Sequence, residues 1–162
     1  RWLVWNFKNT PGKTSASAHI NALNIVVPRM KSILTSTFGI RILKDLTFVC
    51  IPASSAIKTE LRYAEFSKRI CEETGMTNAY DHITVVSSTT EKKFGGSGIC
   101  TESLAFDDYY FKGRYILLFD DVITKGESML RFKRKMEELG ANVIAGFSVG
   151  RTKHERPNDF EI

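Results

Sequence analysis

Two adjacent carboxylates, Asp120 and Asp121, stand directly after an apolar run and shortly before a polar segment. The apolar run covers residues 115–119, and the polar segment, residues 124–128, reads Thr-Lys-Gly-Glu-Ser. Carboxylates accept hydrogen bonds from sugar hydroxyls but repel phosphates. Glycine and hydroxyl side chains at a helix start suit a phosphate, because unpaired N–H groups and the positive end of the helix dipole converge there. The spacing therefore predicts a site for a ribose that carries a 5′-phosphate.

The elements around this segment give it a place in a sheet. An apolar run without polar alternation is typical of a strand buried on both faces of a parallel sheet. A helix is expected after the segment, and its apolar face consists of Met129, Phe132, Met136 and Leu139. Open α/β sheets bind ligands at the carboxyl ends of their strands. We therefore expect Asp120 and Asp121 at the strand's end, without an obvious partner in the sequence.

The stretch Asp120-Asp121-Val122-Ile123-Thr124-Lys125-Gly126-Glu127-Ser128 resembles the phosphoribosyl pyrophosphate (PRPP) signature of type I phosphoribosyltransferases. In that family the paired acids hold the ribose 2′- and 3′-hydroxyls, and the following loop wraps the 5′-phosphate. The resemblance implies a catalytic role for both acids. It also implies that PRPP is bound by both acids and by Thr124, Lys125, Gly126, Glu127 and Ser128. The alternative is an ordinary turn that caps a helix.

Two residues depart from the family pattern. Lys125 stands where the family usually carries a small residue, so its ammonium could either contact the phosphate or point into solvent. Thr124 stands where the 6-oxopurine salvage enzymes place an aspartate. This second departure disfavours a hypoxanthine or guanine acceptor.

The resemblance also assigns a pyrophosphate loop by position. A strand is expected over residues 46–51 and a helix from about residue 59 to residue 74, and small residues lie between them. In type I phosphoribosyltransferases the loop at this place holds the pyrophosphate through backbone amides. The candidates are Ala53, Ser54 and Ser55. The alternative is a plain strand-to-helix N-cap.

A long polar segment, residues 87–98, follows a further strand expected at residues 82–86. Loops of this length inside a domain are usually functional or disordered. The family carries a mobile catalytic loop here, and its glycines would permit closure. The resemblance implies that Lys92 or Lys93 contacts the leaving pyrophosphate, although each could also be a solvated charge.

Composition limits the class of protein. The chain has 162 residues, 43% hydrophobic content, a net charge of +5 and a pI near 9.2. No stretch suits a membrane span or a signal peptide, and the three cysteines without a C-x-x-C pair are typical of reduced thiols in a cytoplasmic protein. The positive charge suits a polyanionic small molecule or nucleic acid. Because the chain starts at Arg1, we expect it to be part of a longer protein.

The predicted architecture is a single α/β domain over residues 1–162, with a mostly parallel central sheet and helices on both faces. The core is expected at about residues 46–149, with residues 1–45 and 150–162 as a small hood or flanking elements. Residues 2–5 are interpreted as an edge or hood strand. A helix that Ser15 or Ser17 caps should end at Gly39 and be kinked or restarted by Pro28.

The resemblance implies that the chain binds Mg²⁺–PRPP and transfers the phosphoribosyl group to an unidentified base or amine, releasing pyrophosphate. Mg²⁺ would be held mainly by ligand oxygens and water. A homodimer is plausible. The alternative is a non-catalytic PRPP-sensing or nucleic-acid-linked module, which the basic pI and the absence of a recognisable base-handling residue favour. Residues 61–66 also resemble a segment of ComF-type competence proteins, which belong to the same superfamily as the type I phosphoribosyltransferases and indicate a ComF/amidophosphoribosyltransferase-like branch.

Overall fold

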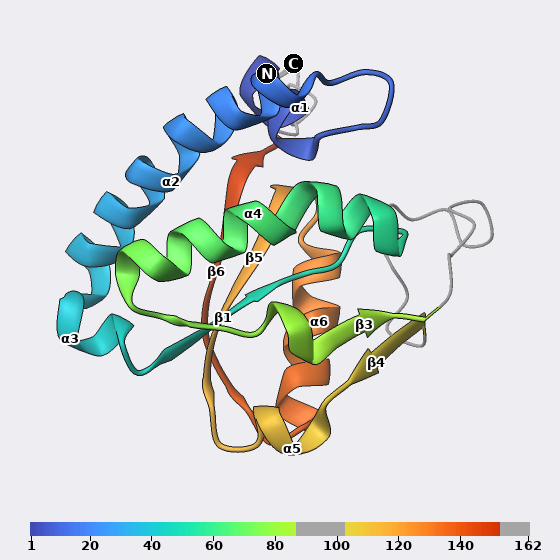
Figure 1. Ribbon diagram of the computed structural model, residues 1–162. Helices are drawn as coiled ribbons and strands as arrows, with labels where there is room; N and C mark the ends of the chain where they lie inside the picture. Colours follow the sequence, from blue (N-terminus) through green and yellow to red (C-terminus); the bar gives the residue numbers. More distant parts are fainter. Residues whose placement is uncertain (87–102, 153–162) are drawn as a thin grey trace, which may run out of the picture.

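The computed structural model describes residues 1–86 and 103–152, and its centre is a parallel sheet with helices on both faces (Figure 1). The strand order is β2-β1-β5-β6, and all three neighbouring pairs are parallel. The strands are β2 (Thr77–Asn78), β1 (Leu46–Cys50), β5 (Tyr115–Ile123) and β6 (Asn142–Arg151). This arrangement confirms the predicted fold class.

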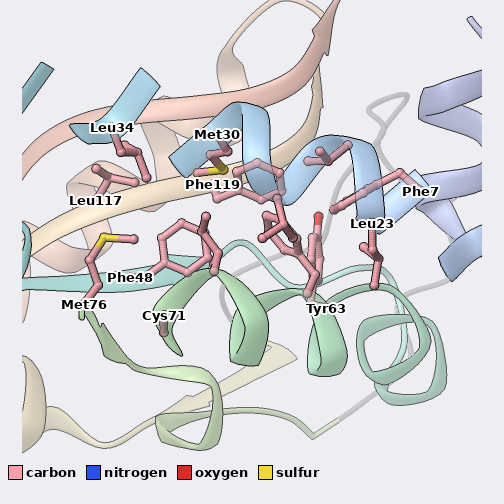
Figure 2. Close-up of a cluster of buried hydrophobic side chains, with 14 of the residues drawn as sticks. Phe7, Leu23, Met30, Leu34, Phe48, Tyr63, Cys71, Met76, Leu117 and Phe119 are labelled. Atoms are coloured by element: carbon pink, nitrogen blue, oxygen red, sulfur yellow. The ribbon is translucent and has the colours of Figure 1, made fainter. Parts of the chain in front are cut away.

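Two apolar clusters hold the helices to the sheet. On one face, α1 (Trp2–Lys8), α2 (Ala16–Phe38) and α4 (Ala56–Thr74) pack against Leu117 and Phe119 of β5. Figure 2 shows this cluster, in which Phe48 and Phe119 of the sheet meet side chains of α2 and α4. On the other face, α6 (Glu127–Glu138) covers Ile116 and Leu118. The unbroken apolar run of β5 is explained by this burial on both faces.

Helix α2 starts and ends where its caps predict. The Ser15 hydroxyl accepts the Ala18 N–H at 3.2 Å, and Gly39, with φ 80°, follows the last residue. Pro28 lies inside one uninterrupted helix, so the helix does not restart there. Seven of its side chains are buried: His19, Ala22, Leu23, Val26, Val27, Met30 and Leu34. The core therefore extends N-terminal to the range 46–149, and α2 is one of its layers. The short helix α3 (Ile40–Leu43) leads into β1.

The interpretation of residues 2–5 as a strand is wrong, because this segment is the start of helix α1. Its apolar residues follow a helical period. Leu3 and Phe7, four positions apart, face the core, whereas Trp2 and Trp5, three positions apart, are more than half exposed. A short apolar run does not distinguish the two structures by itself.

The interpretation of residues 82–86 as a second core strand is also wrong. Strand β3 (Ile83–Val85) follows a short 3-10 helix, η1 (Tyr80–His82), and pairs antiparallel with β4 (Leu104–Phe106) in a separate sheet. In the main sheet, β1 pairs with β5 on one side and, on the other, with the two-residue strand β2, which has no apolar signal. Helix α5 (Asp108–Phe111) leads from β4 towards β5.

Candidate functional site

The apolar run suggests that β5 ends near Phe119, but the strand continues past the acid pair to Ile123. Its ladder with β6 continues through the pairs of Asp120 with Ser148 and Val122 with Gly150. Pairing with β1 stops earlier, because Cys50 lies opposite Phe119. Successive side chains of a strand point to opposite faces of the sheet. The two side chains therefore leave the strand in different directions, but both carboxyls lie near α4, because Tyr63 is bonded to Asp120 and Arg62 pairs with Asp121.

Asp121 points to the face that α1 and α4 cover, and only 6% of it is exposed. Its Oδ2 lies 2.9 Å from Arg62 Nη1 and 3.8 Å from Lys8 Nζ. The Oδ1 atom accepts the Val122 N–H at 2.7 Å. Oδ2 has no aligned hydrogen-bond donor, so charge rather than hydrogen bonding holds it. The expectation that neither acid has a structural partner is therefore wrong for Asp121.

Next to Asp121, the end of α1 is joined to α4 by hydrogen bonds. Arg62 Nε donates to the Lys8 carbonyl oxygen at 3.3 Å, and Asn9 Nδ2 donates to the Leu61 carbonyl oxygen at 2.8 Å. At Gly150 of β6, an added Cβ would lie only 3.0 Å from a methyl group of Val4. These contacts place α1 at the carboxyl-end edge of the sheet (Figure 1). Sequence reasoning missed Lys8 and Arg62 as site residues.

Asp120 is half-buried, and its Oδ1 accepts the Asp121 N–H at 2.8 Å. The Tyr63 hydroxyl donates a long hydrogen bond of 3.5 Å to the same oxygen. Burial, followed by the negative charge of Asp121, raises the pKa of Asp120 to about 7, and the Arg62 charge opposes the shift. Asp120 is therefore an acid that exchanges its proton near neutral pH, as carboxyls of functional sites often do.

After β5, the chain turns into α6 as the motif predicts. Thr124 and Lys125 are exposed, and Gly126 has φ 81° and ψ 3°. Only glycine adopts this backbone without strain, which explains the residue type. Helix α6 begins at Glu127, and its N-cap residue, Gly126, has no side chain to satisfy the first N–H groups. The start of this helix can therefore receive an anion.

The predicted pyrophosphate loop is held by local hydrogen bonds. The Ser55 hydroxyl caps α4 by accepting the Lys58 N–H at 3.2 Å, and Lys58 Nζ donates to the Ser54 hydroxyl at 3.2 Å. The Ala53 N–H donates to Thr59 Oγ1 at 3.0 Å. Ser55 thus has the capping role named as the alternative, and the Ala53 amide must exchange a partner before it can bind a ligand.

A small pocket lies next to this loop, between the end of β1 and η1. Its lining residues are Cys50, Pro52, Thr59, Ala79, Tyr80 and Ile83. None of the predicted site residues lines it. Lys92 and Lys93 lie outside the described residues, so their placement relative to Asp120 stays a prediction.

Comparison with solved structures identifies the fold. An adenine phosphoribosyltransferase matches with a TM-score of 0.56 at 12% identity, over 93% of this chain and 89% of that chain. The UMP synthase of Leishmania donovani matches with a TM-score of 0.50 at 11% identity, over 92% of this chain and 31% of that protein. Adenine phosphoribosyltransferase from Saccharomyces cerevisiae, solved with adenine, reaches a TM-score of 0.49 at 16% identity, over 82% of this chain and 69% of its own.

The sequence itself matches no protein-family model and no curated protein. The structural matches nevertheless show that the chain has the type I phosphoribosyltransferase fold, as the motif at residues 120–128 predicts. In residues 1–86 and 103–152, no helix combines the length and apolar character that crossing a membrane requires.

Proposed function

We propose that this chain binds Mg²⁺–PRPP at the carboxyl-end edge of its sheet and transfers the phosphoribosyl group to a nitrogen nucleophile, releasing pyrophosphate. One observation carries the proposal. Asp120, a half-buried acid, precedes a glycine turn at Gly126 that opens into the start of α6, on a sheet with this fold. The adenine phosphoribosyltransferase that matches over most of both chains suggests a nucleobase as the acceptor.

Each part of the site has a defined task in this reaction. Ionised Asp120 accepts a hydrogen bond from a ribose hydroxyl, and its charge stabilises the positive charge that develops on the ring. The backbone around Gly126 and the first N–H groups of α6 hold the 5′-phosphate, whose binding energy positions the reacting carbon. Residues 53–55 together with Lys92 and Lys93 are the proposed contacts of the pyrophosphate.

Magnesium fits the donors of this site. Mg²⁺ typically takes one or two protein carboxylates and completes its shell with phosphate oxygens and water. Asp120 offers one partly exposed carboxylate for such a shell. Within the described residues, no cluster of three or more histidine, cysteine or acidic side chains forms a metal cage. When bound, the ion would neutralise negative charge on the leaving pyrophosphate.

PRPP with Mg²⁺ is expected to raise the melting temperature, because a ligand that binds only the folded state stabilises it. At a PRPP concentration of a hundred times the dissociation constant, the free energy of unfolding should rise by about 2.7 kcal/mol. For a domain of this size, that gain raises the melting temperature by roughly 5–11 °C. The measurement is a thermal melt with ribose 5-phosphate plus pyrophosphate as the control. Pyrophosphate release with a panel of bases and amines then identifies the acceptor. An unchanged melting temperature at millimolar PRPP would contradict the proposal.

A second function, a PRPP-sensing or nucleic-acid-binding module, is favoured by the net charge of +5 and by the resemblance of residues 61–66 to ComF-type competence proteins. A salt titration separates the two functions. Binding to DNA that weakens steeply as salt rises indicates phosphate contacts and supports the module. PRPP-dependent pyrophosphate release in the absence of nucleic acid supports the enzyme.

The Lys125→Thr variant is expected to bind PRPP at least as tightly as the parent chain. Lys125 is exposed on the turn before α6, and a long side chain directed into a tight phosphate loop would compete with the ligand for space. Isothermal titration calorimetry checks this prediction. A tenfold loss of affinity, about 1.4 kcal/mol, would instead identify Lys125 as a phosphate ligand.

A further inference from the structure

We infer that α1 and the start of α4 form a docking surface for an anionic lipid bilayer. The surface consists of four exposed apolar side chains, which we call the tryptophan patch, and of the cations beside them. The members of the patch are Trp2, Trp5, Ile57 and Leu61. The contact is peripheral, because α1 has seven residues, whereas a helix needs about 20 to cross a bilayer. This inference goes beyond the proposed function and does not depend on PRPP.

The patch lies on the solvent side of two helices. Trp2 and Trp5 are 60% and 61% exposed, and they lie three positions apart on α1, on the side away from the buried Phe7. Ile57 and Leu61 are 67% and 39% exposed, and they lie four positions apart on α4. Side chains three or four positions apart on a helix are neighbours. Each helix therefore presents a pair of adjacent apolar side chains to solvent.

Two hydrogen bonds bring these pairs together. Asn9 Nδ2 donates to the Leu61 carbonyl oxygen at 2.8 Å, and Arg62 Nε donates to the Lys8 carbonyl oxygen at 3.3 Å. Asn9 follows Trp5 by about one turn, so the exposed side of α1 adjoins the start of α4 (Figure 1). Exposed apolar side chains that gather in one place typically mark a site of protein or membrane contact.

The positive charge of the chain is concentrated in its first 44 residues, which form α1, α2 and α3. These residues include seven lysines and arginines and no aspartate or glutamate, so they carry a charge of +7. Residues 45–162 include 16 lysines and arginines and 18 acids, so they carry a charge of −2. A distribution this one-sided suits a partner of negative charge.

Two exposed cations lie beside the tryptophans. Arg1 directly precedes Trp2. Lys13 lies in the loop between α1 and α2, and the hydroxyl of its neighbour Thr14 donates to the Trp5 carbonyl oxygen at 3.5 Å. Each lysine or arginine near an anionic bilayer strengthens binding about fivefold. The border of the patch is therefore suited to anionic headgroups.

A bilayer matches every feature of this surface. Tryptophan is enriched where headgroups meet acyl chains, aliphatic side chains enter the acyl region, and cations attract anionic headgroups. Single-stranded nucleic acid would stack on the tryptophans but would leave Ile57 and Leu61 without a matching group. A second copy in a two-fold contact would place the positively charged border against itself. The combination of apolar side chains and charge therefore favours the bilayer.

Tryptophan fluorescence tests the inference directly, because the chain has two tryptophans and both belong to the patch. The probe is vesicles of equal parts phosphatidylglycerol and phosphatidylcholine. They are expected to shift the emission to shorter wavelength and to carry the chain into the pellet on centrifugation, less so as salt rises. Vesicles of phosphatidylcholine alone should bind at least about tenfold more weakly. No shift and no sedimentation with the anionic vesicles would overturn the inference.

Matched variants separate the patch from a general attraction of charge. Ile57→Asp should weaken binding to the anionic vesicles by at least about tenfold, because it removes an apolar contact and adds a repelled charge. Its control is Ile42→Asp, since Ile42 is 52% exposed on α3, at the other end of α2, and its change should cost less than about twofold. An equal loss for both variants would overturn the inference.

A second pair of variants keeps the test open if Ile57→Asp fails to fold. Lys13→Gln changes an exposed loop residue and should weaken binding to the anionic vesicles about fivefold. Lys44→Gln, in the same basic segment but after α3, should weaken it less than about twofold. Both should melt within about 2 °C of the parent, as surface substitutions usually do. Equal effects of the two substitutions would contradict a contact through the patch.

Two other results would replace the bilayer by another partner and overturn the inference. Quenching of the tryptophan emission by single-stranded DNA, without a shift on vesicles, would identify nucleic acid. A dimer of the parent that Ile57→Asp converts to a monomer, again without a shift on vesicles, would identify a second copy. The vesicle measurements contain no PRPP, so their failure and the failure of the proposed function are separate results.

Discussion

Replacing Phe119 by alanine should lower the free energy of unfolding by about 3–5 kcal/mol, the usual loss for a large aromatic side chain in a core. Phe119 is 1% exposed. The centroid of its ring lies 5.8 Å from those of Phe7 and Phe48 and 6.2 Å from that of Tyr63 (Figure 2). The ring centroid of Phe66 lies at 4.6 Å. These rings come from α1, β1 and α4. The cavity would therefore open where three elements meet, and partial collapse could not fill it.

Urea unfolding at constant pH measures this loss, provided that the slope of the transition stays unchanged. The matched control is Leu130→Ala on α6, since Leu130 is 51% exposed and its loss should cost about 0.5 kcal/mol or less. A loss below about 1 kcal/mol for Phe119→Ala would mean that α1 and α4 do not close over β5. That result would also remove the packing on which the burial of Asp121 depends.

Much of this fold follows from local signals in the sequence. The buried strand β5 shows an unbroken apolar run, α2 has Ser15 and Gly39 at its ends, and the turn before α6 needs a glycine at Gly126. Each signal depends on residues within one or two turns of each other, so the sequence displays it directly. The same reasoning explains why the segment from residue 120 to residue 128 indicates the fold by its sequence alone.

The missed features depend on contacts between distant segments. Nothing near Asp121 in the sequence points to Lys8 or Arg62, because the three residues meet only after α1 and α4 have packed on β5. The length of β5 beyond Phe119 is set by its ladder with β6, a partner that lies downstream in the chain. A two-residue strand such as β2 has too few residues to show a period. Tertiary pairing therefore decides where the acids point.

The Asp120→Asn variant should be more stable than the parent at about pH 8, by roughly 1–3 kcal/mol, and the gain should vanish at low pH. In the folded chain the pKa of Asp120 is raised from 3.8 to about 7, first by burial and then by the Asp121 charge. Between these two values the folded state binds more protons than the unfolded state. The stability of the parent therefore falls as pH rises through this window, and the loss is complete above about pH 7.

Asparagine keeps the shape of the side chain but carries no charge, so the variant does not share this loss. Urea unfolding at about pH 4, 6 and 8 measures the difference between variant and parent, with Asp45→Asn as an exposed control that should stay within about 0.5 kcal/mol at each pH. A variant less stable than the parent at about pH 8 would show that the Asp120 carboxylate stabilises the fold. The expected result is the opposite: the ligand-free protein carries an ionised acid at a cost in stability, which is typical of a residue retained for binding. The same substitution should then improve the fold and weaken PRPP binding, a combination that a purely structural acid could not produce.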